Sequence, residues 1–127
     1  MYSILSYYSL FSRDIEHFNE VVKYNSIMNE LLPSKANDVY KKPSLVLFYS
    51  TTCKHCTSFM PIFNDIVSEC NNINCYIANC STYTAFIDAF NIEHAPTVIL
   101  FYKGNRILYT GSLQYEPIVS WIHEKLL

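Results

Sequence analysis

The 127-residue sequence has little glycine and no strong excess of charge of either sign. Only two residues are glycine, and nine basic residues stand against eleven acidic ones, a formal net charge of −2. The first 44 residues carry five charges of each sign, so no basic arm stands out. Proteins that bind nucleic acid generally carry a clustered basic footprint. The sequence therefore predicts no nucleic-acid partner.

Long apolar runs are missing as well. The longest, at residues 45–49 and 98–102, are strand-length, well short of the roughly 18–20 residues that a membrane span needs. The N-terminal MYSILSYYSLFSRD has no basic residue before its short apolar stretch and no clear small-residue cleavage site, so it is a poor secretory signal. We therefore expect no membrane span, and a location in the cytoplasm or in a virus particle rather than in the secretory pathway.

The amino-acid composition and the length are those of one globular domain. Half of the residues are apolar and 16% are charged, and the length suffices for one hydrophobic core. Five cysteines are too few for a disulfide-stapled scaffold, and their odd number leaves at least one thiol unpaired in a monomer. The many Asn, Tyr and Ile residues resemble the products of AT-rich genomes, including large DNA viruses and some protozoa, so a viral source is a hypothesis.

The first third of the chain is expected to be an arm, a helix and a loop. Residues 1–12 suit a short strand or a flexible arm. A helix is predicted from residue 12 or 14 up to Pro33, because apolar side chains recur at helical spacing. Those side chains are Ile15, Phe18, Val22, Tyr24, Met28, Leu31 and Leu32. Residues 33–43 are predicted to form a polar loop.

The remainder alternates strands with helices. A near-continuous apolar run at 44–50 is typical of a strand buried on both faces. A helix is expected from Cys53 to about Cys70 with a kink at Pro61, then a turn at 71–74 and a second buried strand at 75–78. The next helix is predicted to begin with Ser81 as its cap and to end near residue 90. Its inward side chains would be Phe86, Ile87 and Phe90.

A third strand is predicted at 97–102, followed by a turn at 103–106, a strand at 107–110 and a helix from about 115 to 126. Strands separated by helices pair in parallel, whereas the final hairpin is antiparallel. The prediction is thus an α/β fold whose central mixed sheet, parallel strands plus a C-terminal antiparallel hairpin, is flanked by helices. We divide the chain into residues 1–43, packed on or extending the domain, and a core at 44–127.

The central motif is Thr52-Cys53-Lys54-His55-Cys56, placed where a strand feeds a helix. Free N–H groups and the partial positive charge of a helix N-terminus favour the thiolate of the first cysteine, which is the attacking species. Lys54 and His55 add cationic character nearby. The two-residue spacing lets Cys56 resolve a mixed disulfide formed by Cys53. A C-x-x-C beside a βαβ pattern therefore indicates redox chemistry.

Half of a zinc site is the competing interpretation of this motif. Zinc would need two more ligands, and the other cysteines, Cys70, Cys75 and Cys80, stand five residues apart instead of forming a second C-x-x-C. We therefore predict no metal site. These three cysteines are interpreted as small buried apolar residues, with a regulatory disulfide between two of them left open.

Several further motifs carry a family resemblance. Ala95-Pro96-Thr97 precedes the third strand, and a proline that starts a strand favours a cis peptide bond. The segment LVLFYSTTCKHCTSFMPIF, this proline loop, Lys103-Gly104-Asn105 and Tyr109-Thr110-Gly111 resemble the thioredoxin superfamily. The similarity covers residues 44 to 127 and is closest to the catalytic domains of protein disulfide isomerases.

The resemblance implies roles for the site residues. Cys53 would be the nucleophile and Cys56 the buried resolving thiol, while His55 would stabilise the reduced form and make the disulfide more oxidising, with Lys54 as a second tuning residue. Ala95 and Pro96 would line a groove for an extended substrate segment, and Thr52 joins them as a substrate-binding candidate. No metal or organic cofactor is implied, and the partners would be cysteine-containing proteins and a redox partner.

Three positions depart from the family pattern. The family usually has a buried Asp or Glu where Leu47 stands, Trp where Thr52 stands, and often Arg where Ser112 stands. Without the acid, Cys56 should deprotonate more slowly. We therefore predict a thiol–disulfide oxidoreductase with reduced turnover, leaning to oxidase or isomerase. The alternative is a catalytically weak thioredoxin-fold binding or structural module, for example in a virion. Substrate, direction of exchange and oligomeric state are not predicted.

Overall fold

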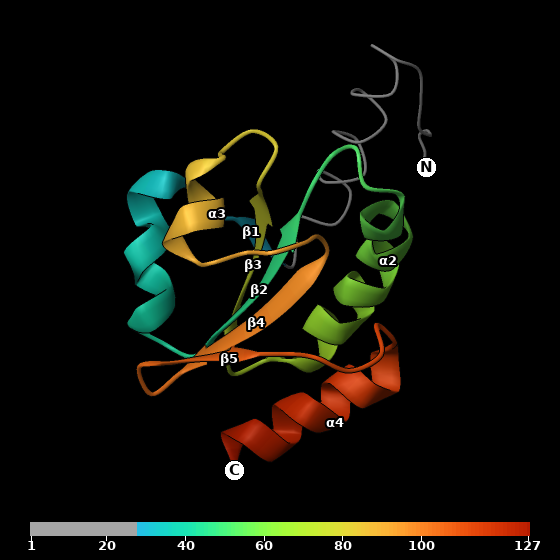
Figure 1. Ribbon diagram of the computed structural model, residues 1–127. Coiled ribbons are helices and arrows are strands. Elements are labelled where there is room, and N and C mark those ends of the chain that lie inside the picture. Colours follow the sequence, from blue (N-terminus) through green and yellow to red (C-terminus); the bar gives the residue numbers. More distant parts are fainter. Residues whose placement is uncertain (1–27) are drawn as a thin grey trace.

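The computed structural model describes residues 28–127, which form a five-stranded mixed sheet covered by helices on both faces (Figure 1). The elements run, in order, β1 (Asn29–Glu30), the 3₁₀ helix η1 (Pro33–Tyr40), β2 (Ser44–Tyr49), α2 (Lys54–Glu69), β3 (Asn74–Asn79), α3 (Ala85–Ala89), β4 (Thr97–Tyr102), β5 (Asn105–Leu108) and α4 (Tyr115–Leu126). The predicted α/β architecture is confirmed. The expected helix between residues 12 and 27 lies outside the described residues.

The sheet has the order β1-β3-β2-β4-β5. The pairs β1–β3 and β2–β3 are parallel, and the pairs β2–β4 and β4–β5 are antiparallel. The prediction that the strand at 97–102 pairs in parallel, with only the final hairpin antiparallel, is therefore wrong. The five-residue α3 is too short to return the chain along the length of a strand, so β4 begins at the edge of the sheet where β3 ends and runs in the opposite direction. All six residues of β2 are buried, as its continuous apolar run predicted. Alternate β2 side chains point to opposite faces. One face packs against α2 and α4, and the other against η1 and α3 (Figure 1).

The helical interpretation of residues 28–32 is wrong. Met28 and Leu31 are buried in the two different cores, one on each face of the sheet. Between them the backbone is extended as β1, and Leu31 N donates to Ile77 O at 2.8 Å. A helix would place positions 28 and 31 on one face. Pairing with the sheet edge and burial on both faces therefore override the local helical spacing.

The loop prediction for residues 33–43 is also wrong in most of its length. Pro33–Tyr40 form the 3₁₀ helix η1, with Pro33 in its first turn, where a missing N–H costs nothing. Val39 is fully buried, and the Tyr40 ring meets the Phe101 ring edge-on with centroids 5.1 Å apart. Residues 28–43 thus supply an edge strand and core side chains to the sheet. The division at residue 43 stays a prediction.

Helix α3 is shorter than predicted. It spans Ala85–Ala89, with Thr84 rather than Ser81 at the N-cap. Phe86 and Phe90 are buried, as expected, but Ile87 is 40% exposed instead of facing inward. Positions 86 and 90 share one helix face, whereas position 87 is rotated about 100° away from it.

The hairpin between β4 and β5 has a tighter turn than expected. Tyr102 pairs with Asn105, so only Lys103 and Gly104 form the turn, and β5 begins two residues earlier than predicted. Both turn residues have positive φ, 53° and 76°. Two such residues match the right-handed twist of a hairpin.

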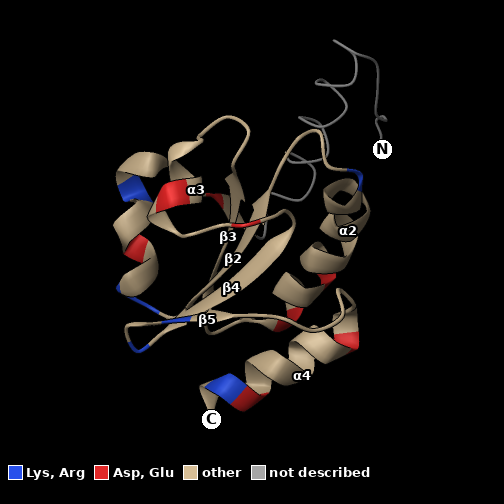
Figure 2. Cartoon of the chain, in the orientation of Figure 1, with Lys and Arg blue, Asp and Glu red and all other residues tan. Residues whose placement is uncertain are grey.

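Helices α2 and α4 lie where the sequence predicted them. Pro61 lies inside α2, and Trp121 of α4 is half-buried with its ring 5.0 Å from that of Tyr109. Within the described part of the chain, no helix combines the length and the apolar character that a bilayer crossing requires. Figure 2 shows charged residues of both signs distributed over several elements.

Candidate active site

Cys53 and Cys56 lie at the N-terminus of α2, just beyond the end of the central strand β2 (Figure 1). Cys53 is the N-cap residue, with extended backbone angles, and its Sγ accepts a hydrogen bond from Cys56 N at 3.2 Å. The sulfur thus takes the place of the capping oxygen that a Ser or Asp would supply. This N–H and the helix N-terminus both stabilise negative charge on the half-buried Cys53 sulfur.

The environment of Cys56 is different. Its side chain is fully buried in the core between the sheet and α2. Burial, followed by the hydrogen bond and the charge interaction with Cys53, raises the pKa of Cys56 to about 12, although a backbone hydrogen bond from Ser50 lowers it. Cys56 is therefore a protonated thiol at neutral pH. The pair combines an accessible sulfur with a buried one.

The loop before β4 completes the site. Cys53 Sγ donates to the Ala95 carbonyl oxygen at 3.5 Å, although the two residues are 42 positions apart. The Ala95–Pro96 peptide bond is cis, Ala95 is half-buried and Pro96 is buried. The fold thus brings Cys53, Cys56, Ala95 and Pro96 together.

The other predicted site residues surround this pair with exposed side chains. Lys54 and His55 are the first two residues of α2, and both are exposed. Thr52 is exposed too, and its Oγ1 lies 3.1 Å from the Ser50 hydroxyl. All three face solvent beside the accessible sulfur of Cys53.

Two of the departures from the family pattern, Leu47 and Ser112, can be examined in the structure. Leu47 is fully buried in the same core as Cys56, and its neighbours across the sheet are Ile77 and Val98. No carboxylate therefore occupies this strand position in the core that holds the Cys56 thiol. Arg106 does not compensate for Ser112, because its guanidinium donates to the Phe90 carbonyl at 3.1 and 2.8 Å.

Sequence reasoning missed two serines beside the site. The Ser50 and Ser81 hydroxyls lie 2.8 Å apart, and Ser81 Oγ also accepts from Thr51 N at 3.0 Å. The two residues are 31 positions apart, so no local pattern indicates their contact. The available signal was positional, since both serines follow neighbouring parallel strands whose C-terminal ends meet at one edge of the sheet.

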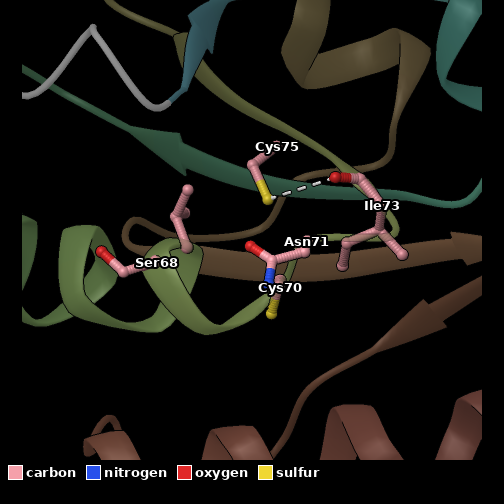
Figure 3. Close-up of a pocket in the computed structure, with 6 residues that line it drawn as sticks. Ser68, Cys70, Asn71, Ile73 and Cys75 are labelled. Carbon is pink, nitrogen blue, oxygen red and sulfur yellow. Dashed lines mark hydrogen bonds between the residues drawn. The ribbon is translucent and has the colours of Figure 1, made fainter.

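The remaining cysteines lie outside this site and are free thiols. Cys70 caps the C-terminal end of α2, opposite to Cys53, and Cys75 is buried in β3. Both line a hollow of about 430 Å³ (Figure 3). Burial raises the pKa of Cys75 to about 12 and also raises the pKa values of Cys70 and Cys80. Among residues 28–127, no three His, Cys, Asp or Glu side chains gather as metal ligands.

Comparison with known families agrees with this geometry. A family model described as Thioredoxin matches residues 17–124. The chain therefore belongs to the thioredoxin family, and the fold is the thioredoxin fold. Its relatives include thioredoxin domains of protein disulfide isomerases, which confirms the resemblance inferred from the motifs.

Individual relatives are distant and mostly much longer. Protein disulfide-isomerase 1 of Caenorhabditis elegans is 28% identical over 85 residues, which is 64% of this chain and 18% of that protein. Protein disulfide-isomerase A4 of Mus musculus is 29% identical over 93 residues, 69% of this chain and 15% of that protein. The chain thus spans less than a fifth of either isomerase. Chloroplastic thioredoxin Y2 of Arabidopsis thaliana is 31% identical over 87 residues, 67% of this chain and 52% of that protein.

Solved structures show the same fold. The J-Trx1 fragment of ERdj5 aligns with a TM-score of 0.81 at 19% identity, covering 94% of this chain and 61% of that one. The first thioredoxin domain of mouse protein disulfide-isomerase A4 aligns with a TM-score of 0.66 at 26% identity, covering 74% of this chain and 71% of that one.

Proposed function

We propose that this protein is a thiol–disulfide oxidoreductase that acts on protein cysteines and leans to oxidase or isomerase chemistry. The observation that carries the proposal is the unequal pair at the start of α2. Cys53 Sγ is accessible and accepts the Cys56 N–H at 3.2 Å, whereas Cys56 is buried and protonated. A nucleophile and a resolving thiol need this division of roles.

The proposed cycle uses only the two cysteines. The Cys53 thiolate attacks one sulfur of a substrate disulfide, a new S–S bond forms, and the other substrate sulfur leaves as a thiolate that takes a proton from water. Cys56 then loses its proton and attacks Cys53 Sγ, releasing the second substrate thiol. Two electrons have passed to the substrate, and the Cys53–Cys56 disulfide remains. In the reverse direction the oxidised protein donates that disulfide, and a redox partner restores it.

Substrate recognition is assigned to the loop opposite Cys53. The Ala95 carbonyl lies 3.5 Å from Cys53 Sγ, so a chain paired with the backbone at Ala95 and Pro96 would bring its own sulfur to the nucleophile. An extended segment can bind in this way, through main-chain hydrogen bonds. The exchange needs no metal or organic cofactor, because the cysteine pair itself carries the electrons.

A binding or structural module is the second candidate, and Leu47 is the observation that favours it. With a buried leucine in place of an acid, nothing at this strand position takes the proton of Cys56. A slow second step would let mixed disulfides persist. Such a protein would capture cysteine-containing partners rather than turn them over.

The reduction potential of the Cys53–Cys56 pair tests the proposal. The protein is equilibrated in glutathione buffers of graded poise, and mass-resolved alkylation reads the fraction of the pair that is oxidised. We expect a value near that of protein disulfide isomerase, about −180 mV, whereas a value near that of thioredoxin, about −270 mV, would indicate a reductase.

Two controls complete this experiment. Cys70→Ser should leave the potential unchanged, because Cys70 lies at the C-terminal end of α2, opposite to the Cys53–Cys56 pair. Cys56→Ser should abolish the reversible pair. If the unaltered protein forms no reversible pair at any poise, the oxidoreductase proposal fails and the binding module takes its place.

A further inference from the structure

Three hydroxyl groups form a row beside the nucleophile. The Thr52 Oγ1 lies 3.1 Å from the Ser50 Oγ, and the Ser50 Oγ lies 2.8 Å from the Ser81 Oγ. Thr52, which directly precedes Cys53, and Ser81 are exposed, whereas Ser50 is half-buried. The hydroxyl row therefore has two ends that solvent or a substrate can reach, and one end belongs to the residue next to Cys53.

The order of the strands decides on which side of Cys53 this row lies. Cys53 follows β2, Ser81 follows β3, and Ala95 and Pro96 precede β4, so all of them lie at the same edge of the sheet (Figure 1). Because β2 lies between β3 and β4, Cys53 lies between the loop at Ala95 and the loop that carries Ser81. A substrate segment that extends beyond Cys53, away from Ala95, therefore meets the hydroxyl row.

The hydrogen bonds within the row leave one O–H group free. A hydroxyl group donates one hydrogen bond and accepts two. The Ser50 Oγ accepts from Thr52 N at 3.4 Å, so it accepts from only one neighbouring hydroxyl and donates to the other. The Ser81 Oγ accepts from Thr51 N at 3.0 Å. Depending on the direction in which the three O–H groups point, the free O–H group belongs to Thr52 or to Ser81.

The Thr52 hydroxyl can therefore act as donor or as acceptor toward a substrate. When the row runs from Ser81 to Thr52, the Thr52 O–H is free to donate, and in the opposite direction its oxygen keeps two lone pairs open. An amide side chain carries both a donor and an acceptor, so it forms a hydrogen bond with Thr52 in either state. An apolar side chain displaces water from the same hydroxyl without replacing its hydrogen bonds, which costs free energy.

We propose that Thr52 is a specificity-determining residue, and that the hydroxyl row selects substrates with an amide side chain, Asn or Gln, next to the reacting cysteine. This inference names a substrate class for the oxidoreductase function proposed above and rests on that function. Leucine has nearly the shape of asparagine but no hydrogen-bonding group in its side chain. A comparison of these two residues in a substrate therefore separates hydrogen bonding from shape.

A double-mutant cycle in the full chain tests this selection. Two peptide disulfides differ only in having Asn or Leu beside the cysteine, and a second pair carries the same change on the other side of the cysteine. Reduced protein is mixed with each peptide, and rapid acid quench with mass spectrometry gives the rate at which the Cys53 mixed disulfide forms. The unaltered protein is compared with Thr52→Val, which replaces the hydroxyl by a methyl group. Any intrinsic difference between the peptides acts on both proteins and cancels in the cycle.

We expect the ratio of the Asn rate to the Leu rate to be about fivefold higher for the unaltered protein than for Thr52→Val in at least one peptide pair, the factor that corresponds to one net hydrogen bond. Thr52→Ser, which retains the hydroxyl, should keep the higher ratio. Thr82→Val is the matched control and should keep it too, because Thr82 is exposed on the same loop as Ser81 and its hydrogen bond to Asn79 comes from the backbone. An unchanged ratio in Thr52→Val for both peptide pairs, including equal slowing with Asn and Leu, would overturn the proposal.

A second measurement keeps the two proposals apart. If the unaltered protein forms no mixed disulfide with any of the peptides, the oxidoreductase function fails. Analogues of the peptides with serine in place of cysteine then test the selection alone, because they bind without reacting. Tighter binding of the Asn analogue than of the Leu analogue in NMR titrations, lost in Thr52→Val, supports the selection of an amide. Equal or undetectable binding of the two analogues overturns it.

Discussion

At the scale of single residues, the active site depends on two identical side chains in different environments. Cys53 ends the turn after β2, with its sulfur half-buried at a helix N-terminus. Cys56 lies three positions later, less than one helical turn away, and points into the core. Because ionisation costs more free energy in a buried position, Cys56 keeps its proton at neutral pH, and the more accessible Cys53 is the one we propose as the nucleophile.

Leu47 provides a test of this site at the residue scale. Leu47→Glu should speed the decay of the mixed disulfide by roughly tenfold or more, because a buried carboxylate can accept the proton of Cys56. Rapid quench of the peptide reaction measures this rate. The substitution should also lower the free energy of unfolding by about 2–4 kcal/mol, since it replaces a fully buried leucine.

Leu47→Gln is the control for this prediction. The Gln side chain has nearly the same shape as Glu, and burying it should lower the free energy of unfolding by a similar amount. Unlike a carboxylate, however, the amide cannot take up a proton at neutral pH. Equal decay rates in the Glu and Gln variants would show that the missing acid does not limit the resolving step.

At the scale of elements, a short helix can be essential to a core. Helix α3 has only five residues, yet Phe86 is almost fully buried beneath it. The Phe86 ring meets those of Phe48, Tyr83 and Phe90, with centroids 5.8 to 6.4 Å apart. These aromatic contacts attach α3 to the face of the sheet opposite to α2.

Phe86 and Ile87 form a matched pair in this helix. Phe86→Ala should lower the free energy of unfolding by about 3–5 kcal/mol, because it removes a buried ring and leaves a cavity. Ile87→Ala should cost under about 1 kcal/mol, because Ile87 is 40% exposed. Urea unfolding followed by circular dichroism measures both. Similar losses in the two variants would contradict the burial that the structure assigns to them.

At the scale of the whole molecule, the sheet separates two cores, and three buried thiols lie in them. Cys56 and Cys75 belong to the core beneath α2 and α4, and Cys80 belongs to the core beneath η1 and α3. Burial raises the pKa of each of these thiols in the folded state. In the unfolded chain the same groups are exposed to water and ionise near their ordinary value.

The stability of the molecule should therefore fall at alkaline pH. Above about pH 9 the unfolded state loses thiol protons that the folded state keeps, so the free energy of unfolding declines as pH rises toward 12. Below about pH 9 the three thiols keep their protons in both states, so their contribution to the free energy of unfolding is fully present. For Cys75 alone the loss between pH 7 and pH 10.5 is about 2 kcal/mol. Urea unfolding of the reduced protein at these two pH values measures it.

Cys75→Ala isolates the contribution of one thiol. Between pH 7 and pH 10.5, the free energy of unfolding of this variant should fall by about 2 kcal/mol less than that of the unaltered protein. Ile77→Val, in the same strand and the same core, removes packing but no titratable group, and should retain the full pH dependence. An unaltered pH dependence in Cys75→Ala would contradict the raised pKa.

The sequence by itself determined the elements whose local signals agree with their burial. The continuous apolar run of β2, the motif at the start of α2, the proline before β4 and the amphipathic α4 all lie where the pattern predicted them. In these segments, side-chain spacing and local backbone preference favour the same structure, so no distant contact is needed to choose between alternatives.

Only the tertiary structure decided the remainder. Residues 28–32 have helical spacing, but residues 29–31 pair with β3, because the sheet edge offers backbone hydrogen bonds and burial on both faces. Likewise, nothing local to Ser50 indicates that Ser81 is its partner. That contact exists because parallel pairing of β2 with β3 brings the two strand ends together, and such long-range pairing is a property of the whole fold.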